Sequence, residues 1–230
     1  MSQFEAPEQP HRSLNPLLWD HEDLQKPVQI ALLKIARAYW EFLKIDTPIV
    51  DIVVSGSQAN YNYSSHSDID LHLIVSYDQV QCDMAVDELF DTKRLLWKAQ
   101  HDINIHNIPV EVYVEDTAHP AVSAAYSILS NKWITPPQRD PRKPDVKRIK
   151  QLCHSWVTAI THAVRSGDLE QITQTKDLLW AYRKVGLARE GEMGTPNLVF
   201  KTLRNSGVTE QLLRAVSHLR DEELSLEDQN

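Results

Sequence analysis

The sequence predicts an α+β protein, with a small mixed sheet and flanking helices followed by a helical domain. Three observations predict it. Short apolar runs rich in β-branched residues occur in the first half, at 49–55, 69–75 and 108–114. Four prolines then fall within 136–144, which is typical of a linker. Beyond them, apolar residues recur at the spacing of an α-helix.

The first part of the chain divides into an N-terminal arm (1–26) and a domain (27–116). The arm is polar and proline-containing, and we expect it to dock through Leu17, Leu18 and Trp19. Pro27 suits the first turn of a helix that continues to Phe42. A strand is expected at 49–55, and 59–67 is expected to be a loop, or a short helix followed by a loop. The later elements expected in this domain are a strand at 69–75, a helix at 83–99 whose apolar positions include Leu95 and Leu96, and a hairpin of 101–105 with 108–114 around His106-Asn107.

The second part is expected to hold a Pro-rich hinge at 117–145 and a helical domain at 146–220. Thr195-Pro196 is a typical helix start within that domain. The last ten residues, 221–230, carry five acidic side chains and no basic one, and we expect an acidic tail without regular structure.

Composition narrows the function classes. The chain has 230 residues and a net charge of −8, so long-range electrostatics do not favour a polyanion as partner. Its two cysteines do not make a disulfide framework. No apolar run approaches the roughly 18 residues that span a bilayer, and the N-terminus lacks the apolar core of a signal peptide. We therefore expect a cytoplasmic protein with no membrane partner.

Three carboxylates are the candidate catalytic and metal-binding groups. Asp68, Asp70 and His72 share one face of a strand, because successive side chains of a strand alternate. Glu111 lies in a third apolar strand, and the acids converge if the two strands are neighbours. Close carboxylates repel one another unless cations neutralise them. Oxygen ligands of this kind suit Mg²⁺ or Mn²⁺, and we expect two ions per site.

A small-residue turn precedes these acids and suggests a nucleotide site. Gly56 allows close approach of the backbone to phosphates, and Ser57 offers a hydroxyl and an amide as donors. Tyr61 and Asn62, in the loop that follows, are candidate contacts of the base or ribose.

The order of these motifs resembles the nucleotidyltransferase superfamily that includes polymerase beta. Gly56-Ser57, ten residues, the pair Asp68 and Asp70, and a distant strand carboxylate at Glu111 match its pattern. The overall plan is similar to minimal or antibiotic-type members with a helical C-terminal domain. The resemblance implies a nucleotidyltransferase fold, and metal-dependent transfer of an NMP from an NTP such as ATP to an acceptor hydroxyl, with release of pyrophosphate.

Several alternatives stay open. The segment 132–150 holds seven bases and two acids; it is either a solvated linker or a phosphate clamp in which Lys147 and Arg148 bind the nucleotide. The acceptor is a small molecule or a protein by preference, and an RNA 3′ end is the alternative. A nucleotide-binding or sensing module without turnover is a further alternative. A serine hydrolase or a zinc site is disfavoured, since neither the spacing around Ser57 nor that of the histidines fits.

Overall fold

The computed structural model describes Phe4 and residues 10–81, 85–118 and 123–225. The chain divides into two compact units. One spans Pro10–Arg139, and the other contains the chain from Asp140 onward together with Phe4. In the described part of the chain, no helix is both long and apolar enough to cross a bilayer.

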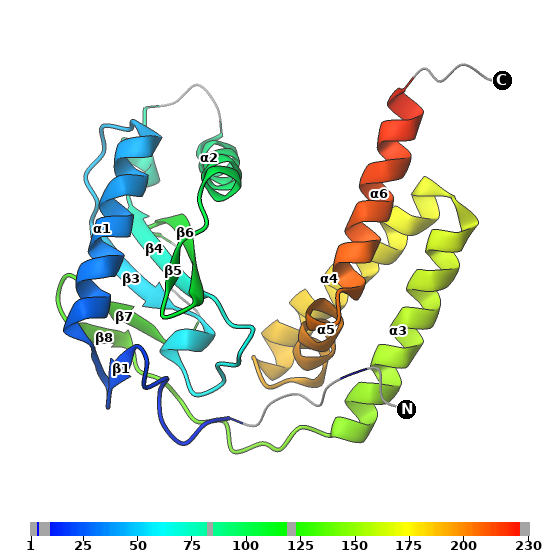
Figure 1. Ribbon diagram of the computed structural model, residues 1–230, viewed down its shortest axis with the longest axis horizontal. Helices are drawn as coiled ribbons and strands as arrows, with labels where there is room; N and C mark the ends of the chain where they lie inside the picture. The colour runs from blue at the N-terminus through cyan, green and yellow to red at the C-terminus, as the bar shows by residue number, and fades with distance from the viewer. Residues whose placement is uncertain (1–3, 5–9, 82–84, 119–122, 226–230) are drawn as a thin grey trace. The chain divides into compact units, whose positions relative to one another are not determined.

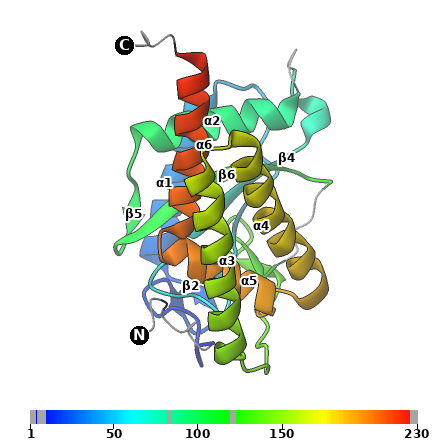
Figure 2. The ribbon, with the colours of Figure 1, turned by 90° about the vertical axis from the view of Figure 1, so that its right-hand side faces the viewer.

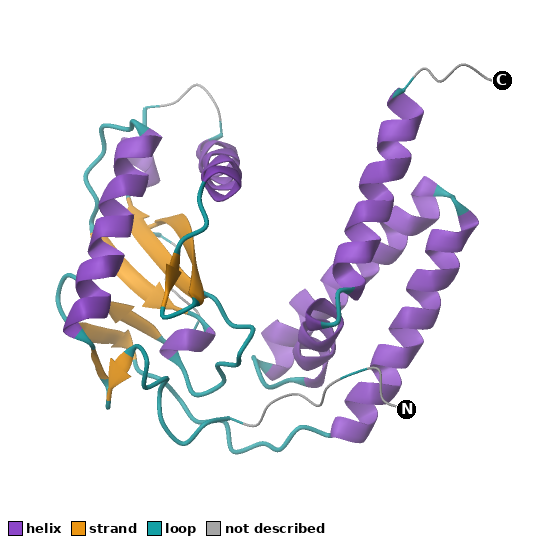
Figure 3. Ribbon diagram, viewed as in Figure 1, coloured by secondary structure: helices purple, strands orange, loops and turns teal. Residues whose placement is uncertain are grey.

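The first unit is built on a six-stranded mixed sheet, shown in Figures 1 and 3. Its strand order is β5-β6-β4-β3-β7-β8, and β4 with β6 is the parallel pair. The predicted fold class, an α+β chain with a mixed sheet and flanking helices followed by further helices, is confirmed. The strands are β3 (Asp51–Ser55), β4 (Ile69–Val75), β5 (Asn104–Ile105), β6 (Ile108–Asp116), β7 (Ala125–Ser127) and β8 (Lys132–Thr135).

One face of the sheet forms the core. Ile69, Leu71 and Leu73 of β4 are fully buried. Tyr39 of α1 (Lys26–Leu43) meets Trp97 of α2 (Val86–Gln100) edge to face at 5.3 Å, so both helices belong to this core. The polar residues that alternate with the buried ones on β4 are therefore left on the opposite face.

The N-terminal segment of this unit forms a short hairpin, β1 (Trp19–Asp20) with β2 (Asp23–Leu24). Leu18 and Trp19 are buried, whereas Leu17 is about half exposed. The Trp19 ring stacks on Trp133 of β8 at 4.9 Å, which fixes the segment to the edge of the sheet.

The structure differs from the hinge expected over 117–145. Strand β7 pairs with β3, and β8 pairs with β7, so the sheet extends to Thr135 and the first unit to Arg139. The reason is burial: Ala125, Tyr126 and Ile128 are almost fully enclosed, and a free linker would leave them in water.

The second unit consists of four helices around a core of its own. They are α3 (Val146–Ser166), α4 (Leu169–Glu190), α5 (Thr195–Asn205) and α6 (Val208–Leu224). Figure 2 shows α3 and α6 side by side. Asp145 and Asp168 cap α3 and α4 by accepting from backbone amides, as N-cap carboxylates do. The expected acidic tail begins inside α6, and its last five residues lie outside the described part.

Candidate active site

The register of three strands places Asp70 in the middle of a polar row. Ser55 of β3 lies opposite Asp70, and Glu111 of β6 is the partner of Asp70 on the other side. Neighbouring strands are about 4.8 Å apart, so directly paired side chains on one face are close neighbours. The condition for convergence, that the strands of Asp70 and Glu111 adjoin, is met.

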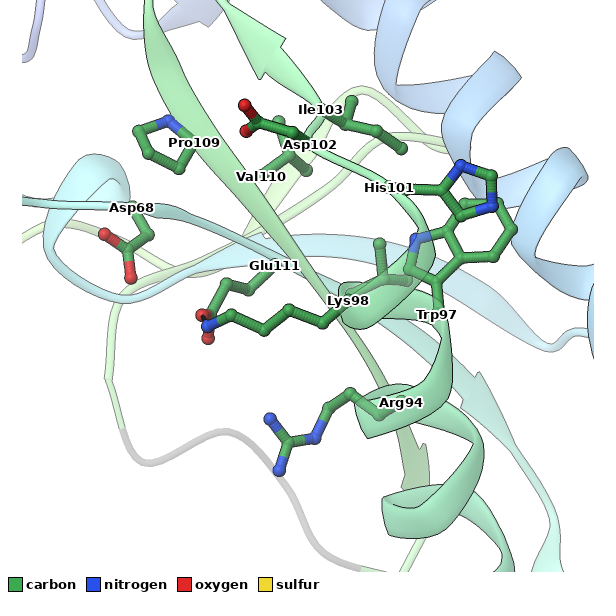
Figure 4. Close-up of a pocket in the computed structure, with 11 residues that line it drawn as sticks. Asp68, Arg94, Trp97, Lys98, His101, Asp102, Ile103, Pro109, Val110 and Glu111 are labelled. Carbon is green, nitrogen blue, oxygen red and sulfur yellow. Dashed lines mark hydrogen bonds and ion pairs between the residues drawn. The ribbon is translucent and has the colours of Figure 1, made fainter. Parts of the chain in front are cut away.

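Asp68 lies one residue before β4. Together with Glu111 it lines a pocket of about 300 Å³ (Figure 4). The three carboxylates predicted from the sequence therefore belong to one region. Asp70 is beside Glu111 by register, and Asp68 and Glu111 line the same pocket.

Basic and hydroxyl groups hold the carboxylate of Glu111. Lys98 of α2 donates to Oε1, and Tyr113 donates to Oε2 at 2.5 Å. Burial by itself would raise the pKa of Glu111, but the hydrogen bonds from Lys98 and Tyr113 outweigh burial and lower it. Burial and the bond to Glu111 raise the pKa of Tyr113, so its hydroxyl stays protonated. Glu111 is thus an ionised carboxylate at neutral pH.

The donor set fits a divalent cation in chemistry and register, because Asp70 and Glu111 present hard oxygens from adjacent strand positions. The side chains as they stand are not gathered into a ligand cluster. Among the described residues, no three His, Cys, Asp or Glu side chains are grouped closely enough to hold a metal. Glu111 has its two oxygens directed at Lys98 and Tyr113 instead.

Gly56 lies against Asp70. Its φ of 74° and ψ of −158° fall in a region that is essentially open to glycine alone. A β-carbon at this position would overlap with Asp70 Oδ2. The backbone conformation of residue 56 therefore requires glycine, and the absence of a β-carbon leaves the space that Asp70 Oδ2 occupies.

The turn after Gly56 is fixed by a buried amide that the sequence did not single out. Gln58 accepts from Asn15 Nδ2 at 2.9 Å and donates to the carbonyl of Ser67 at 3.0 Å. Its own carbonyl accepts from Trp19 Nε1 at 2.8 Å. Gln58 thus ties both ends of the loop to the N-terminal hairpin; a lone glutamine in a polar loop gives no sequence signal of such a role.

Hydroxyl groups gather at the start and end of this loop. Ser57 Oγ donates to Ser67 Oγ at 2.9 Å, and the Ser64 amide donates to the same oxygen at 3.0 Å. Ser57 starts the short 3-10 turn Ser57–Ala59. The loop therefore presents several hydroxyls close to Gly56, which is the chemistry expected of a phosphate contact.

Tyr61 and Asn62 follow in this loop. The Tyr61 ring lies under the guanidinium of Arg139 at 4.8 Å, and its carbonyl accepts from the His11 amide at 2.7 Å. Both residues are partly buried. Contact of either with a base or ribose stays a prediction.

Lys147 and Arg148 lie in the first turn of α3, in the helical unit, and both are exposed. Arg142, in the same basic segment, is paired with Asp140 and donates to the carbonyl of Glu190 at the end of α4 at 2.6 Å. Arg142 is therefore held by contacts within the helical unit. Binding of nucleotide by Lys147 and Arg148 stays a prediction.

His72 belongs to a second polar row beside the acids. Its Nε2 is 2.8 Å from Ser55 Oγ, and its Nδ1 is 2.9 Å from Glu115 Oε1. The order serine, imidazole, carboxylate is that of a hydrolase triad. Ser55 is nevertheless buried within β3 beside Asp70, whose charge would repel an oxyanion there. We interpret this row as support for the strand that carries Asp70.

Two cations near the acids were missed in the sequence, Arg94 and Lys98. They are four residues apart on α2, so they lie on one helix face. Arg94 lies over the ring of Tyr113 at 5.1 Å. Both therefore contact side chains on the polar face of β6. The i, i+4 spacing was visible, but it is common on solvated helix faces.

Comparison with known proteins gives little support to the predicted family resemblance. No protein-family model and no curated protein matches the chain. A search of solved structures finds the STING-associated CdnE c-di-GMP synthase from Capnocytophaga granulosa, at 12% identity and a TM-score of 0.22, over 87% of this chain and 83% of that one. A likeness at this level carries no argument for fold or activity.

Proposed function

We propose that this protein is a metal-dependent nucleotidyltransferase, which moves an NMP from an NTP to an acceptor hydroxyl. The single observation that carries the proposal is the row Ser55–Asp70–Glu111, in which Gly56 directly adjoins Asp70. A loop suited to phosphate thus meets a pair of carboxylates on adjacent strands. The motif resemblance in the sequence points to the same reaction.

In the proposed reaction, the acceptor oxygen forms a bond to the α-phosphorus of the NTP. The bond from that phosphorus to the α–β bridging oxygen breaks, and its electron pair leaves with pyrophosphate. The hydroxyl proton passes to solvent, because a carboxylate that holds a cation is a weak base. Gly56 and Ser57 position the triphosphate, and Asp70 and Glu111 face the reacting phosphorus.

Asp68, Asp70 and Glu111 are the residues that would hold the proposed Mg²⁺ or Mn²⁺, two ions in all. Bound there, the ions would supply positive charge to the reacting and leaving phosphates. For Glu111 to serve as a ligand, its carboxylate must turn away from Lys98. Lys98 then loses its partner and is available to another anion.

The ion pair of Lys98 with Glu111 also favours a second candidate function. A protein that binds a nucleotide without turnover would retain Gly56 and the loop while the third acid stays occupied by Lys98. Release of pyrophosphate distinguishes the two functions, since only a transferase produces it in proportion to enzyme turnover.

The test is a thermal shift assay combined with a pyrophosphate assay on the full chain. Mg²⁺ with an NTP should raise the melting temperature, and the rise should grow with ligand concentration above its Kd. Mg²⁺ alone should do little, because this ion usually shares its shell with substrate phosphates. No shift with any NTP would overturn the proposal, and a shift without pyrophosphate release in cell extract would favour the binding module.

A further inference from the structure

The pocket beside Glu111 lies entirely within the first unit. It is formed by the end of α2, the segment that follows and the start of β6, with Asp68 at one side. Its volume is about 300 Å³, at the lower end of the range for small-molecule sites. The residues that line it include Asp68, Arg94, Trp97, Lys98, Asp102 and Glu111.

The pocket and Gly56 lie on opposite sides of the acids. Gly56 follows Ser55 of β3, which adjoins Asp70, whereas the pocket opens beyond Glu111 on β6. A triphosphate on the turn of Gly56 and Ser57 therefore leaves this pocket to a different molecule. Because Glu111 and Asp68 line the pocket, a molecule bound there would contact these acids from the side opposite the triphosphate.

The two ends of the pocket differ in charge. Figure 4 shows Lys98 and Arg94 extending from α2 toward the side where the Glu111 carboxylate lies, with Asp102 at the other end. Arg94 has one ion contact, 3.5 Å to Asp91, and its buried Nε has no hydrogen-bond partner among the described residues. A guanidinium with unused donors beside a lysine is suited to phosphate.

The opposite end suits hydroxyl groups. Asp102 is exposed, and its Oδ1 accepts from Asn104 at 3.0 Å, which leaves a carboxylate with spare acceptor capacity. Trp97 and Val110 supply apolar wall between the two ends. The pocket thus joins a cationic end, a short apolar wall and an acceptor for hydroxyls.

We infer that this pocket binds the acceptor of the proposed reaction, and that the acceptor is a small hydroxyl compound carrying a phosphate group. Arg94 and Lys98 bind the phosphate, and Asp102 accepts from a hydroxyl. Lys98 changes partner from Glu111 to the phosphate when the carboxylate is engaged elsewhere. Identifying the ligand as the acceptor rests on the proposed function, whereas the binding of phosphate in this pocket can be tested by itself.

The test is isothermal titration of the full chain with ribose 5-phosphate, inorganic phosphate, ribose and gluconate, with Mg²⁺ and a non-hydrolysable ATP analogue present. The two phosphates should bind, with ribose at least about 10-fold weaker than ribose 5-phosphate, as expected when a charge-assisted contact is lost. Gluconate tests whether a carboxylate serves as well. Binding of gluconate as tight as that of ribose 5-phosphate would overturn the assignment of phosphate.

Variants locate the site. Arg94→Gln and Lys98→Gln should each weaken ribose 5-phosphate about 10-fold and leave ribose unchanged. Lys93→Gln is the matched control, because Lys93 lies on the same helix but over the ring of Phe42 at 5.5 Å. Equally weakened binding of ribose 5-phosphate in Lys93→Gln would show that the effect comes from the net charge of the helix, and would overturn the inference. The comparison of ribose 5-phosphate with ribose in the unaltered protein needs no variant to fold.

Failure of this inference and failure of the proposed function give different results. If the ATP analogue binds and no phosphate compound does, the pocket assignment is wrong and nucleotidyl transfer still stands. If phosphates bind through Arg94 and Lys98 but no NTP binds, the proposed transfer is wrong. A short RNA with a free 3′ hydroxyl that displaces ribose 5-phosphate and binds tighter would replace the small acceptor by an RNA end.

Discussion

Asp70 occupies the space that a β-carbon on residue 56 would need. A β-carbon on Gly56 would overlap with Oδ2 of Asp70 and lie 3.1 Å from its Cγ. The obstacle is the tip of a side chain, which can rotate. A substitution at residue 56 is therefore expected to move the carboxylate rather than the strand.

This contact predicts the behaviour of Gly56→Ala. The glycine-only backbone conformation should cost about 1–3 kcal/mol of stability. In addition, Asp70 should be displaced, and both pyrophosphate release and stabilisation by Mg²⁺ with NTP should fall strongly. Thermal melting and the pyrophosphate assay measure the two effects.

Gly191→Ala is the matched control. Gly191 has nearly the same conformation, with φ 71° and ψ −167°, but its added β-carbon would meet only Arg142 Nη2 at 3.7 Å. It should lose similar stability and retain turnover. If both variants lose turnover equally, the contact with Asp70 is not what matters at residue 56.

Asp70→Asn should abolish transfer while the fold persists. Removing a carboxylate that would hold the proposed metal should cost several kcal/mol in the transition state, which means a rate loss of about 100-fold or more. The neighbours Ile69 and Leu71 carry the core, so the melting temperature should stay or rise as repulsion with Glu111 is relieved. Glu41→Gln, an exposed acid on α1, should leave turnover unchanged. Turnover at the normal rate in Asp70→Asn would contradict the mechanism.

The ion pair of Glu111 predicts a component of acid stability in metal-free protein. The pKa of Glu111 is lower in the folded state than the ordinary 4.5, so the unfolded chain binds the proton more readily. This contribution is present above about pH 4.5 and is lost as the pH falls through the folded-state value. Glu111→Gln should therefore flatten the fall in melting temperature on acidification, measured in EDTA.

Lys98→Met tests the cause of that shift. Because Lys98 donates to Glu111, its removal should raise the pKa of the carboxylate and flatten the acid limb in the same direction as Glu111→Gln. The double variant should show no further flattening. Additive effects in the double variant would show that the two side chains act independently.

Local patterns in the sequence were enough for much of the fold around the acids. Alternation along β4 placed Asp70 between the buried Ile69 and Leu71, and the structure has this arrangement. The hairpin expected around His106-Asn107 is present, and both residues have positive φ, as a two-residue turn of this kind requires. Such features depend on neighbours in the sequence.

Features that depend on distant pairing could not be predicted in this way. Strands β7 and β8 are only three and four residues long, and Pro136 follows β8 directly, so local sequence gives little sign of either strand. The burial of Tyr126 depends on the pairing of β7 with β3, which is distant in the sequence. On α2, Phe90 and Trp97 face the core, whereas Leu95 and Leu96 are exposed. That rotation of the helix is what directs Lys98 toward Glu111, and no local periodicity specifies it.

Two tyrosines, one fully and one partly buried, allow a prediction about stability that is independent of catalysis. Tyr39 is fully buried, and its hydroxyl has no hydrogen-bond partner among the described residues. Tyr77 is partly buried, and its hydroxyl donates to the carbonyl of Val114 at 3.0 Å. Burial raises the pKa of each to about 12, so both hydroxyls are neutral across the ordinary pH range.

Tyr39→Phe should therefore be neutral or stabilising by about 1 kcal/mol, because it removes an unsatisfied buried hydroxyl without leaving a cavity. Tyr77→Phe should destabilise by about 1 kcal/mol, since it removes a made hydrogen bond and leaves the Val114 carbonyl with one partner fewer. The urea midpoints of the two variants, measured against the unaltered chain, should shift in opposite directions or differ by that amount. Equal loss of stability in both variants would mean that the hydroxyl of Tyr39 is hydrogen-bonded in solution.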